Sequence, residues 1–241
     1  MRPLGYLLVL ALPVSSFAQT PAPSPTPKPP RTPESAVTPG RENLRRHAQF
    51  LDRIKDGPVG LLFLGDSITD GWPRTGERTW LQFAPYQPAN FGISGETTEQ
   101  VLWRITNGEL EGIQPKVVVI MIGTNNIGQF ADEKPEWAAA GIKKIIDTIQ
   151  EKLPQAKILL LGVFPRGKKA SEQRAKVDAI NAIISGYGDG DRVRYLDIGA
   201  KFLDAQGEIP ADVMPDLLHP NAKGYAIWYE AMNPTLREMM P

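Results

Sequence analysis

The chain of 241 residues contains no cysteine and only two histidines, His47 and His219. Without cysteine it can form no disulfide, no thiolate metal site and no cysteine nucleophile. A serine nucleophile needs an imidazole or another base to take its proton. If the chain carries out acyl-transfer chemistry with histidine as the base, that base is therefore His47 or His219.

The sequence also lacks an excess of charge of either sign, because Lys and Arg together number 27 and so do Asp and Glu. A balanced chain produces no overall field that would draw it to nucleic acid or to an anionic lipid surface. We therefore expect a small, mostly uncharged partner molecule and no binding to nucleic acid.

The apolar run near the start of the chain is too short for a typical membrane span. Arg2 is followed by an apolar stretch over residues 4–14 and then by Ser16-Phe17-Ala18, which is the pattern of a secretory signal peptide. A spanning helix needs about 20 apolar residues, and Pro13 interrupts this stretch. We predict a signal peptide over residues 1–18, no stable membrane insertion, and a secreted or periplasmic protein. A secreted chain without disulfides favours a bacterial source.

Residues 19–40 differ in composition from the rest of the chain, being rich in Pro, Thr, Ser and Ala. Such a segment has little apolar area to bury and few amide donors, so it is predicted to be a disordered, partly polyproline-II tether. Residues 41–241 remain as one domain, and about 200 residues suffice for a single core. No internal repeat is evident.

The remaining sequence alternates apolar runs with segments of helical periodicity. Runs without polar alternation are typical of strands covered on both faces. Strands alternating with helices indicate βαβ units, and hence a three-layer α/β/α fold with a five-stranded parallel sheet. The predicted strands are 59–64, 89–93, 117–122, 158–163 and 193–198, and the predicted helices are 41–55, 98–105, 137–153, 171–184 and 221–240.

Polar residues follow several of the predicted strands. Ser67 follows the first strand, Gly95 the second and Asn125 the third, while Asp216 and His219 lie between the fifth strand and the last helix. In open α/β sheets, ligands bind outside the carboxyl ends of the strands. We therefore expect these residues to meet at one edge of the sheet.

Each of these residues has a chemical and a structural interpretation. Ser67 is either a nucleophile near a helix N-terminus or a cap of that helix. The Gly95 amide is either an oxyanion donor or part of a glycine turn before a Thr-capped helix. Asn125 offers either a neutral donor to an oxyanion or an Asx turn.

Asp216 and His219 are near enough in sequence to hydrogen-bond within one loop, and Pro220 suits the first turn of the following helix. The alternative makes Asp216 a turn residue and His219 a surface imidazole. His47 lies beside Arg45 and Arg46, which indicates a solvated helix face. His219 is therefore the better candidate base.

Taken together, the four segments resemble the sequence blocks of the SGNH, or GDSL-type, hydrolase superfamily, at Ser67, Gly95, Asn125 and His219. The resemblance implies a flavodoxin-like sheet and no metal or cofactor. It also implies catalytic residues Ser67, His219 and Asp216, and an oxyanion hole formed by the Ser67 and Gly95 amides with the Asn125 side chain.

Within that superfamily the chain is similar to the catalytic subunits of intracellular platelet-activating-factor acetylhydrolase. The likeness lies in Asn90-Phe91-Gly92-Ile93, Val101-Leu102-Trp103-Arg104, Asn107-Gly108-Glu109-Leu110, Gly123-Thr124-Asn125-Asn126 and Pro165-Arg166-Gly167. The export signal departs from that subfamily, and Ile68-Thr69-Asp70-Gly71-Trp72 resembles bacterial secreted esterases of acylated carbohydrates.

These patterns predict a secreted serine esterase of short-chain, chiefly acetyl, esters on sugars or polysaccharides. One alternative is a lysophospholipase or a platelet-activating-factor-like acetylhydrolase, with an apolar groove lined by Trp72, Trp80, Phe83 and Trp103. Core packing would explain these aromatic residues equally well. A second alternative is a non-catalytic binding module on the same fold. The expected assembly is a monomer or a homodimer.

Overall fold

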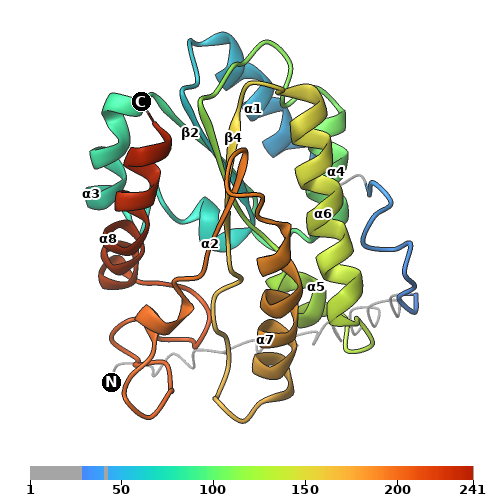
Figure 1. Cartoon of the computed structure of the whole chain (residues 1–241), viewed down its shortest axis with the longest axis vertical. Helices are drawn as coiled ribbons and strands as arrows, with labels where there is room; N and C mark the ends of the chain where they lie inside the picture. Colours follow the sequence, from blue (N-terminus) through green and yellow to red (C-terminus); the bar gives the residue numbers. More distant parts are fainter. Residues whose placement is uncertain (1–28, 41–42, 241) are drawn as a thin grey trace, which may run out of the picture.

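The computed structural model describes residues 29–40 and 43–240, which form a three-layer α/β/α fold (Figure 1). The central sheet has five parallel strands in the order β2-β1-β3-β4-β5. Flavodoxin-like sheets have this order, so the predicted fold class is confirmed. The strands are β1 (Leu61–Gly65), β2 (Pro88–Gly92), β3 (Val117–Met121), β4 (Lys157–Leu161) and β5 (Val193–Leu196).

The register of the sheet brings the first three strands to an end at one level. Gly65, the last residue of β1, pairs with Gly92 of β2 and with Met121 of β3. All residues of β1 and β3 are buried, because helices cover both faces, and this explains their continuous apolar sequences. The loops after β1, β2 and β3 therefore leave the sheet side by side at its carboxyl edge.

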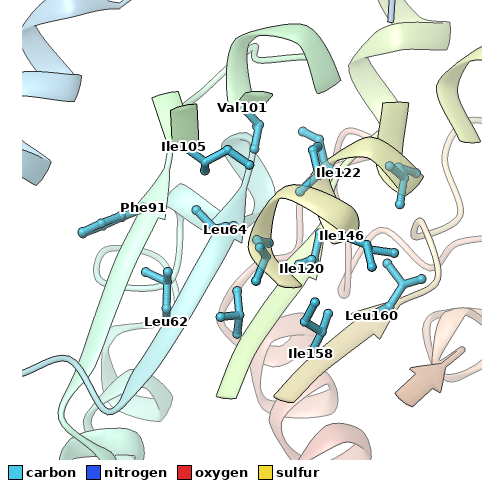
Figure 2. Close-up of a cluster of buried hydrophobic side chains, with 14 of the residues drawn as sticks. Leu62, Leu64, Phe91, Val101, Ile105, Ile120, Ile122, Ile146, Ile158 and Leu160 are labelled. Atoms are coloured by element: carbon cyan, nitrogen blue, oxygen red, sulfur yellow. The ribbon is translucent and has the colours of Figure 1, made fainter. Parts of the chain in front are cut away.

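One face of the sheet packs against helices that carry the larger apolar cluster (Figure 2). Leu62 and Leu64 of β1, Ile120 of β3 and Ile158 of β4 point toward it. The helices on this face are α1 (Leu44–Lys55), α4 (Thr98–Thr106), α5 (Thr124–Gln129), α6 (Pro135–Lys152) and α7 (Glu172–Ile184).

The opposite face packs against α8 and several short elements, with α3 beside α8 in Figure 1. Its core is rich in aromatic side chains, and Trp72, Phe83 and Trp228 are fully buried. The helices of this face are α2 (Ser67–Asp70), α3 (Glu77–Trp80) and α8 (Ala222–Met239), with the 3-10 helices η1 (Leu81–Tyr86) and η3 (Gly199–Phe202). A further 3-10 helix, η2 (Ser185–Tyr187), follows α7.

All five predicted strands and all five predicted long helices are present, with boundaries shifted by a few residues. Three helices are short. The sequence indicated a helix after Ser67 but not the bounds of α2, and α3 and α5 were not predicted. Each has four to six residues, which is too short to show a helical periodicity. Two of them, α2 and α5, begin where the sequence predicted functional residues.

The segment 29–40 differs from the predicted tether, because it is packed on the domain. Arg31 forms ion pairs with Glu99 and Glu133, and Ala36 is fully buried. Thr98 Oγ1 donates a hydrogen bond to the Ala36 carbonyl over 2.9 Å. Specific ion pairs and a buried alanine thus hold a segment whose composition alone predicts disorder, and we call residues 29–40 the strap.

The predicted signal peptide and the first part of the predicted tether lie outside the described residues. Within the described part of the chain, no helix is both long and apolar enough to cross a membrane.

Candidate active site

Ser67 lies at the tight junction between β1 and α2. A Cβ atom on Gly65 would come within 2.3 Å of the Met121 carbonyl oxygen, so the last residue of β1 has to be glycine. Asp66 is the N-cap of α2, and its Oδ1 accepts a hydrogen bond from the Ile68 amide. Ser67 is the first helical residue and its side chain caps nothing, which removes the capping interpretation.

The loop between η3 and α8 carries Asp216 and His219. Oδ1 of Asp216 accepts hydrogen bonds from the amides of Leu218 at 3.1 Å and His219 at 2.7 Å. Leu217 has a φ of 59°, a left-handed conformation that is unfavourable for leucine. Its carbonyl accepts a hydrogen bond from the Gly167 amide, and this turn brings the two side chains together. Asn221, rather than Pro220, begins α8 as its N-cap.

Ser67, His219 and Asp216 form a continuous chain of hydrogen bonds. Ser67 Oγ lies 2.9 Å from His219 Nε2, and His219 Nδ1 lies 2.6 Å from Asp216 Oδ2. A carboxylate facing Nδ1 keeps the proton on that nitrogen, which leaves Nε2 free to accept the serine proton. The Asp216 and His219 side chains are 55% and 43% exposed, so solvent and substrate can reach them.

The environment of Asp216 favours the carboxylate form. Burial alone would raise its pKa, but hydrogen bonds from the His219 backbone and ring, together with the charge of the imidazole, hold the pKa below its usual value. Asp216 is therefore ionised at neutral pH and can stabilise an imidazolium at His219.

The other two predicted residues follow the neighbouring strands β2 and β3. Gly95 has a φ of 83° and nothing within 4 Å of the place where a Cβ would be, and its N–H donates to no acceptor in the described part of the chain. Asn125 is the second residue of α5, and its Nδ2 donates to the Glu96 carbonyl over 2.9 Å. The second hydrogen of that amide remains for a ligand.

Two charged residues near this site were not singled out for a role by the sequence. Asp66 is fully buried, and burial raises its pKa to about 7 although the Ile68 amide and the charges of His219 and Arg166 favour ionisation. Arg166 Nη1 donates to the carbonyl and hydroxyl oxygens of Thr124, the first residue of α5. Burial lowers the pKa of Arg166, while Asp66 and Asp216 oppose that change. Neither the burial of Asp66 nor the electrostatic interaction between these two residues can be read from local sequence.

His47 is not the solvated surface residue predicted from its neighbours. It is 7% exposed, its Nδ1 lies 3.0 Å from Glu109 Oε1, and its ring packs edge-on against Trp103. The prediction was wrong because, of the two neighbouring arginines on α1, only Arg45 is exposed, while Arg46 pairs with Asp70 and His47 is buried on the same helix as Phe50. His47 pairs with Glu109 and not with Ser67, so His219 is the histidine at the candidate site.

A large hollow lies at the other edge of the sheet. Its volume is about 690 Å³, and it lies below the amino ends of β1, β3 and β4, between Pro58, Pro115 and Ala156. Its lining contains no serine, histidine or aspartate. The surroundings of Ser67 are therefore the better candidate for a hydrolytic site. Within the described residues, no group of three or more acidic or histidine side chains could hold a metal ion.

The chain is similar in sequence to a known family of hydrolases. Residues 63–227 match the model of the GDSL-like lipase/acylhydrolase family, which is more than half of the chain. The platelet-activating factor acetylhydrolase IB subunit alpha2 of Rattus norvegicus is 39% identical over 185 residues, covering 76% of this chain and 78% of that one. Subunit alpha1 of Homo sapiens is 34% identical over 219 residues, covering 90% and 91%.

Solved structures share the same fold. A GDSL-like lipase from Bacteroides thetaiotaomicron superposes with a TM-score of 0.69 at 20% identity, covering 81% of this chain and 99% of that one. A variant of an acetyl-xylooligosaccharide esterase from Geobacillus gives a TM-score of 0.61 at 24% identity, covering 74% and 93%. Similarity at this level of identity indicates a common fold.

Proposed function

Because the chain belongs to the GDSL-like lipase/acylhydrolase family and is an ester-hydrolysing enzyme, we propose that it cleaves short-chain, chiefly acetyl, esters by acylation of Ser67. The observation that carries this proposal is the hydrogen-bonded chain from Ser67 through His219 to Asp216, at 2.9 and 2.6 Å. Nucleophile, base and orienting acid stand in the arrangement that acyl transfer requires.

In the proposed mechanism, Ser67 Oγ attacks the ester carbonyl while His219 Nε2 takes the hydroxyl proton. The Ser67 and Gly95 amides and Asn125 Nδ2 stabilise the oxyanion of the tetrahedral intermediate. His219 then gives its proton to the departing alcohol, which leaves Ser67 acylated. Water, deprotonated by the same imidazole, releases the carboxylic acid and restores the serine.

The preference for acetyl groups on a carbohydrate is supported by two kinds of similarity. The curated relatives are named acetylhydrolases, and one structural neighbour is named an acetyl-xylooligosaccharide esterase. The balanced charge of the chain suits an uncharged sugar as the alcohol. We further propose that the protein is exported, with cleavage after Ala18, since a polysaccharide substrate lies outside the cell.

A lipid ester is the second candidate, and the names of the relatives favour it. The packing of the aromatic residues that were expected to line its acyl groove does not support this candidate. Trp72 and Phe83 are fully buried against Phe63 in the core, and Trp103 packs against His47. Trp80 also contacts Phe63. These side chains are accounted for by packing, so a long acyl chain has no evident groove among them.

Substrate profiling tests the proposal. The purified mature enzyme should release p-nitrophenol from the acetyl ester faster than from long-chain esters, and should deacetylate acetylated xylan faster than it cleaves lysophosphatidylcholine. Equal or faster cleavage of long-chain esters would reject the short acyl site. Preference for lysophosphatidylcholine would favour the lipid candidate.

A further inference from the structure

A buried chain of charged residues ends at the backbone of the candidate oxyanion hole. Glu96 follows Gly95 directly, and its Oε2 accepts a hydrogen bond from Arg104 Nε over 2.8 Å. Arg104 Nη1 pairs with Glu109, whose other oxygen lies 3.0 Å from His47 Nδ1. The side chains of Glu96, Arg104 and Glu109 have no exposed surface. None of these groups touches Ser67 or His219, and the proposed mechanism does not use them.

Arg104 forms hydrogen bonds at both ends of the segment between Phe91 and Glu96, which carries Gly95. Its Nη2 donates to the carbonyl of Phe91, near the end of strand β2, over 3.0 Å, and its Nε donates to Glu96 at the other end of the segment. Gly95 lies between these two contacts. One rigid guanidinium, with its donors in a fixed plane, therefore sets the separation of the two ends of the segment that carries the Gly95 amide.

Glu96 also connects Arg104 to Asn125, the third candidate oxyanion donor. Its backbone carbonyl accepts the hydrogen bond from Asn125 Nδ2, while its side chain is held by Arg104. The Gly95 amide and the Asn125 amide thus depend on the position of the same residue. Oxyanion donors stabilise the transition state only when they are correctly placed in advance, and small displacements reduce catalysis.

We propose that Glu96 and Arg104 are positioning residues, which hold the Gly95 and Asn125 donors in place for the tetrahedral intermediate. Glu109, which is hydrogen-bonded to His47, in turn orients Arg104 through Nη1. The inference rests on the proposed function, because it assigns a role within the same oxyanion hole. It also gives a role to Arg104 and Glu109, which lie in two of the segments that resemble the acetylhydrolase subunits. The proposed mechanism at Ser67, His219 and Asp216 does not use either residue.

The test combines Glu96→Gln with a double-mutant cycle. Glutamine keeps the size of the side chain and removes the ion pair with Arg104. We expect kcat for p-nitrophenyl acetate to fall about 10-fold, somewhat less than the loss of a whole donor, with KM changed less than about 2-fold because ground-state binding is untouched. The separate variant Arg104→Lys should also have less activity than the wild type, since lysine keeps the charge but cannot bridge Phe91 and Glu96.

The cycle distinguishes positioning from a general loss of stability. If Glu96 acts through the oxyanion hole, Glu96→Gln should lower kcat by a smaller factor in the Asn125→Ala background than in the wild type, because the part of its effect that passes through Asn125 is already lost. Ile149→Val, in the core of α6, serves as a control that lowers Tm without touching this network and should keep kcat. Fully additive effects, or an unchanged kcat in Glu96→Gln, would overturn the inference. An inactive wild-type enzyme would instead reject the proposed function.

Discussion

Asp66 caps the helix that begins with the nucleophile and is also fully buried, which is rare for an aspartate without a charged partner. Its Oδ1 accepts the Ile68 amide, while its Oδ2 is buried without a hydrogen-bond partner in the described residues. The folded state therefore favours the protonated acid, and burial raises the pKa to about 7. An aspartate in the unfolded chain titrates near 4.

This difference predicts a pH-dependent stability. Between about pH 4 and pH 7 the folded protein retains a proton that the unfolded chain has lost, so its free energy of unfolding decreases as the pH rises through this window, by at most ~1.4 kcal/mol per pH unit. Asp66→Asn removes the titrating group and keeps an oxygen for the Ile68 amide. The Tm of Asp66→Asn minus that of the wild type should increase from pH 4 to pH 8.

Asp189 supplies the matched control for that measurement. Hydrogen bonds from backbone amides, chiefly that of Val193, hold its pKa below the usual value. Its contribution to stability is therefore fully present above about pH 4, and the effect of Asp189→Asn on Tm should not change between pH 5 and pH 8. A pH-independent effect of Asp66→Asn over the same range would contradict the assignment.

Asn125 is the oxyanion donor that mutation can remove most cleanly. Asn125→Ala deletes the amide and leaves Ser67 and His219 in place, so kcat for the acetyl ester should fall about 100-fold or more. KM should change little, because the interaction forms mainly in the transition state. Steady-state kinetics measure both quantities, and an unchanged kcat would remove Asn125 from the oxyanion hole.

At the level of elements, the strap shows how far a segment's sequence can mislead. Arg31 lies between the carboxylates of Glu99 and Glu133, at 2.7 and 2.6 Å, and over the ring of Phe130. These partners are about 70 and 100 residues away in the chain. Composition predicts a tether here because it cannot register contacts with residues so distant in sequence.

The strap predicts a large effect of a single substitution. Arg31→Ala leaves Glu99 and Glu133 buried without their cation, and breaking a buried ion pair in this way typically costs about 3–5 kcal/mol. Urea denaturation should show that loss in Arg31→Ala. Lys55→Ala, which removes an exposed ion pair with Asp52, should cost less than about 1 kcal/mol. Equal stability of the two variants would mean that the strap does not stabilise the domain.

The long elements were predictable for a reason that the short ones do not share. Buried parallel strands such as β1 and β3 have continuous apolar sequences, and α6 spans enough turns for its apolar face to show. Helices α2 and α5 have too few residues for that signal. Helix α2 begins instead at the local N-cap Asp66, and the start of α5 is held by the long-range contact of Arg166 with Thr124.

For the whole molecule, the sheet order explains why sequence could indicate the site. β1 lies between β2 and β3, so the residues that follow these strands, Ser67, Gly95 and Asn125, emerge as neighbours at the carboxyl edge. Parallel topology and strand order thus account for the grouping. The buried contacts of His47 and Asp66 could not be predicted, because burial depends on which distant elements pack against them.

The most direct test of the central claim is covalent labelling of the nucleophile. The mature enzyme is treated with a fluorophosphonate, the modified peptide is identified by mass spectrometry, and acetyl ester hydrolysis is measured in parallel. We predict one adduct, on Ser67, and loss of both labelling and activity in Ser67→Ala and His219→Ala. Ser185→Ala, at the exposed end of α7, should retain both. An adduct on another residue, or hydrolysis retained by Ser67→Ala, would contradict the account.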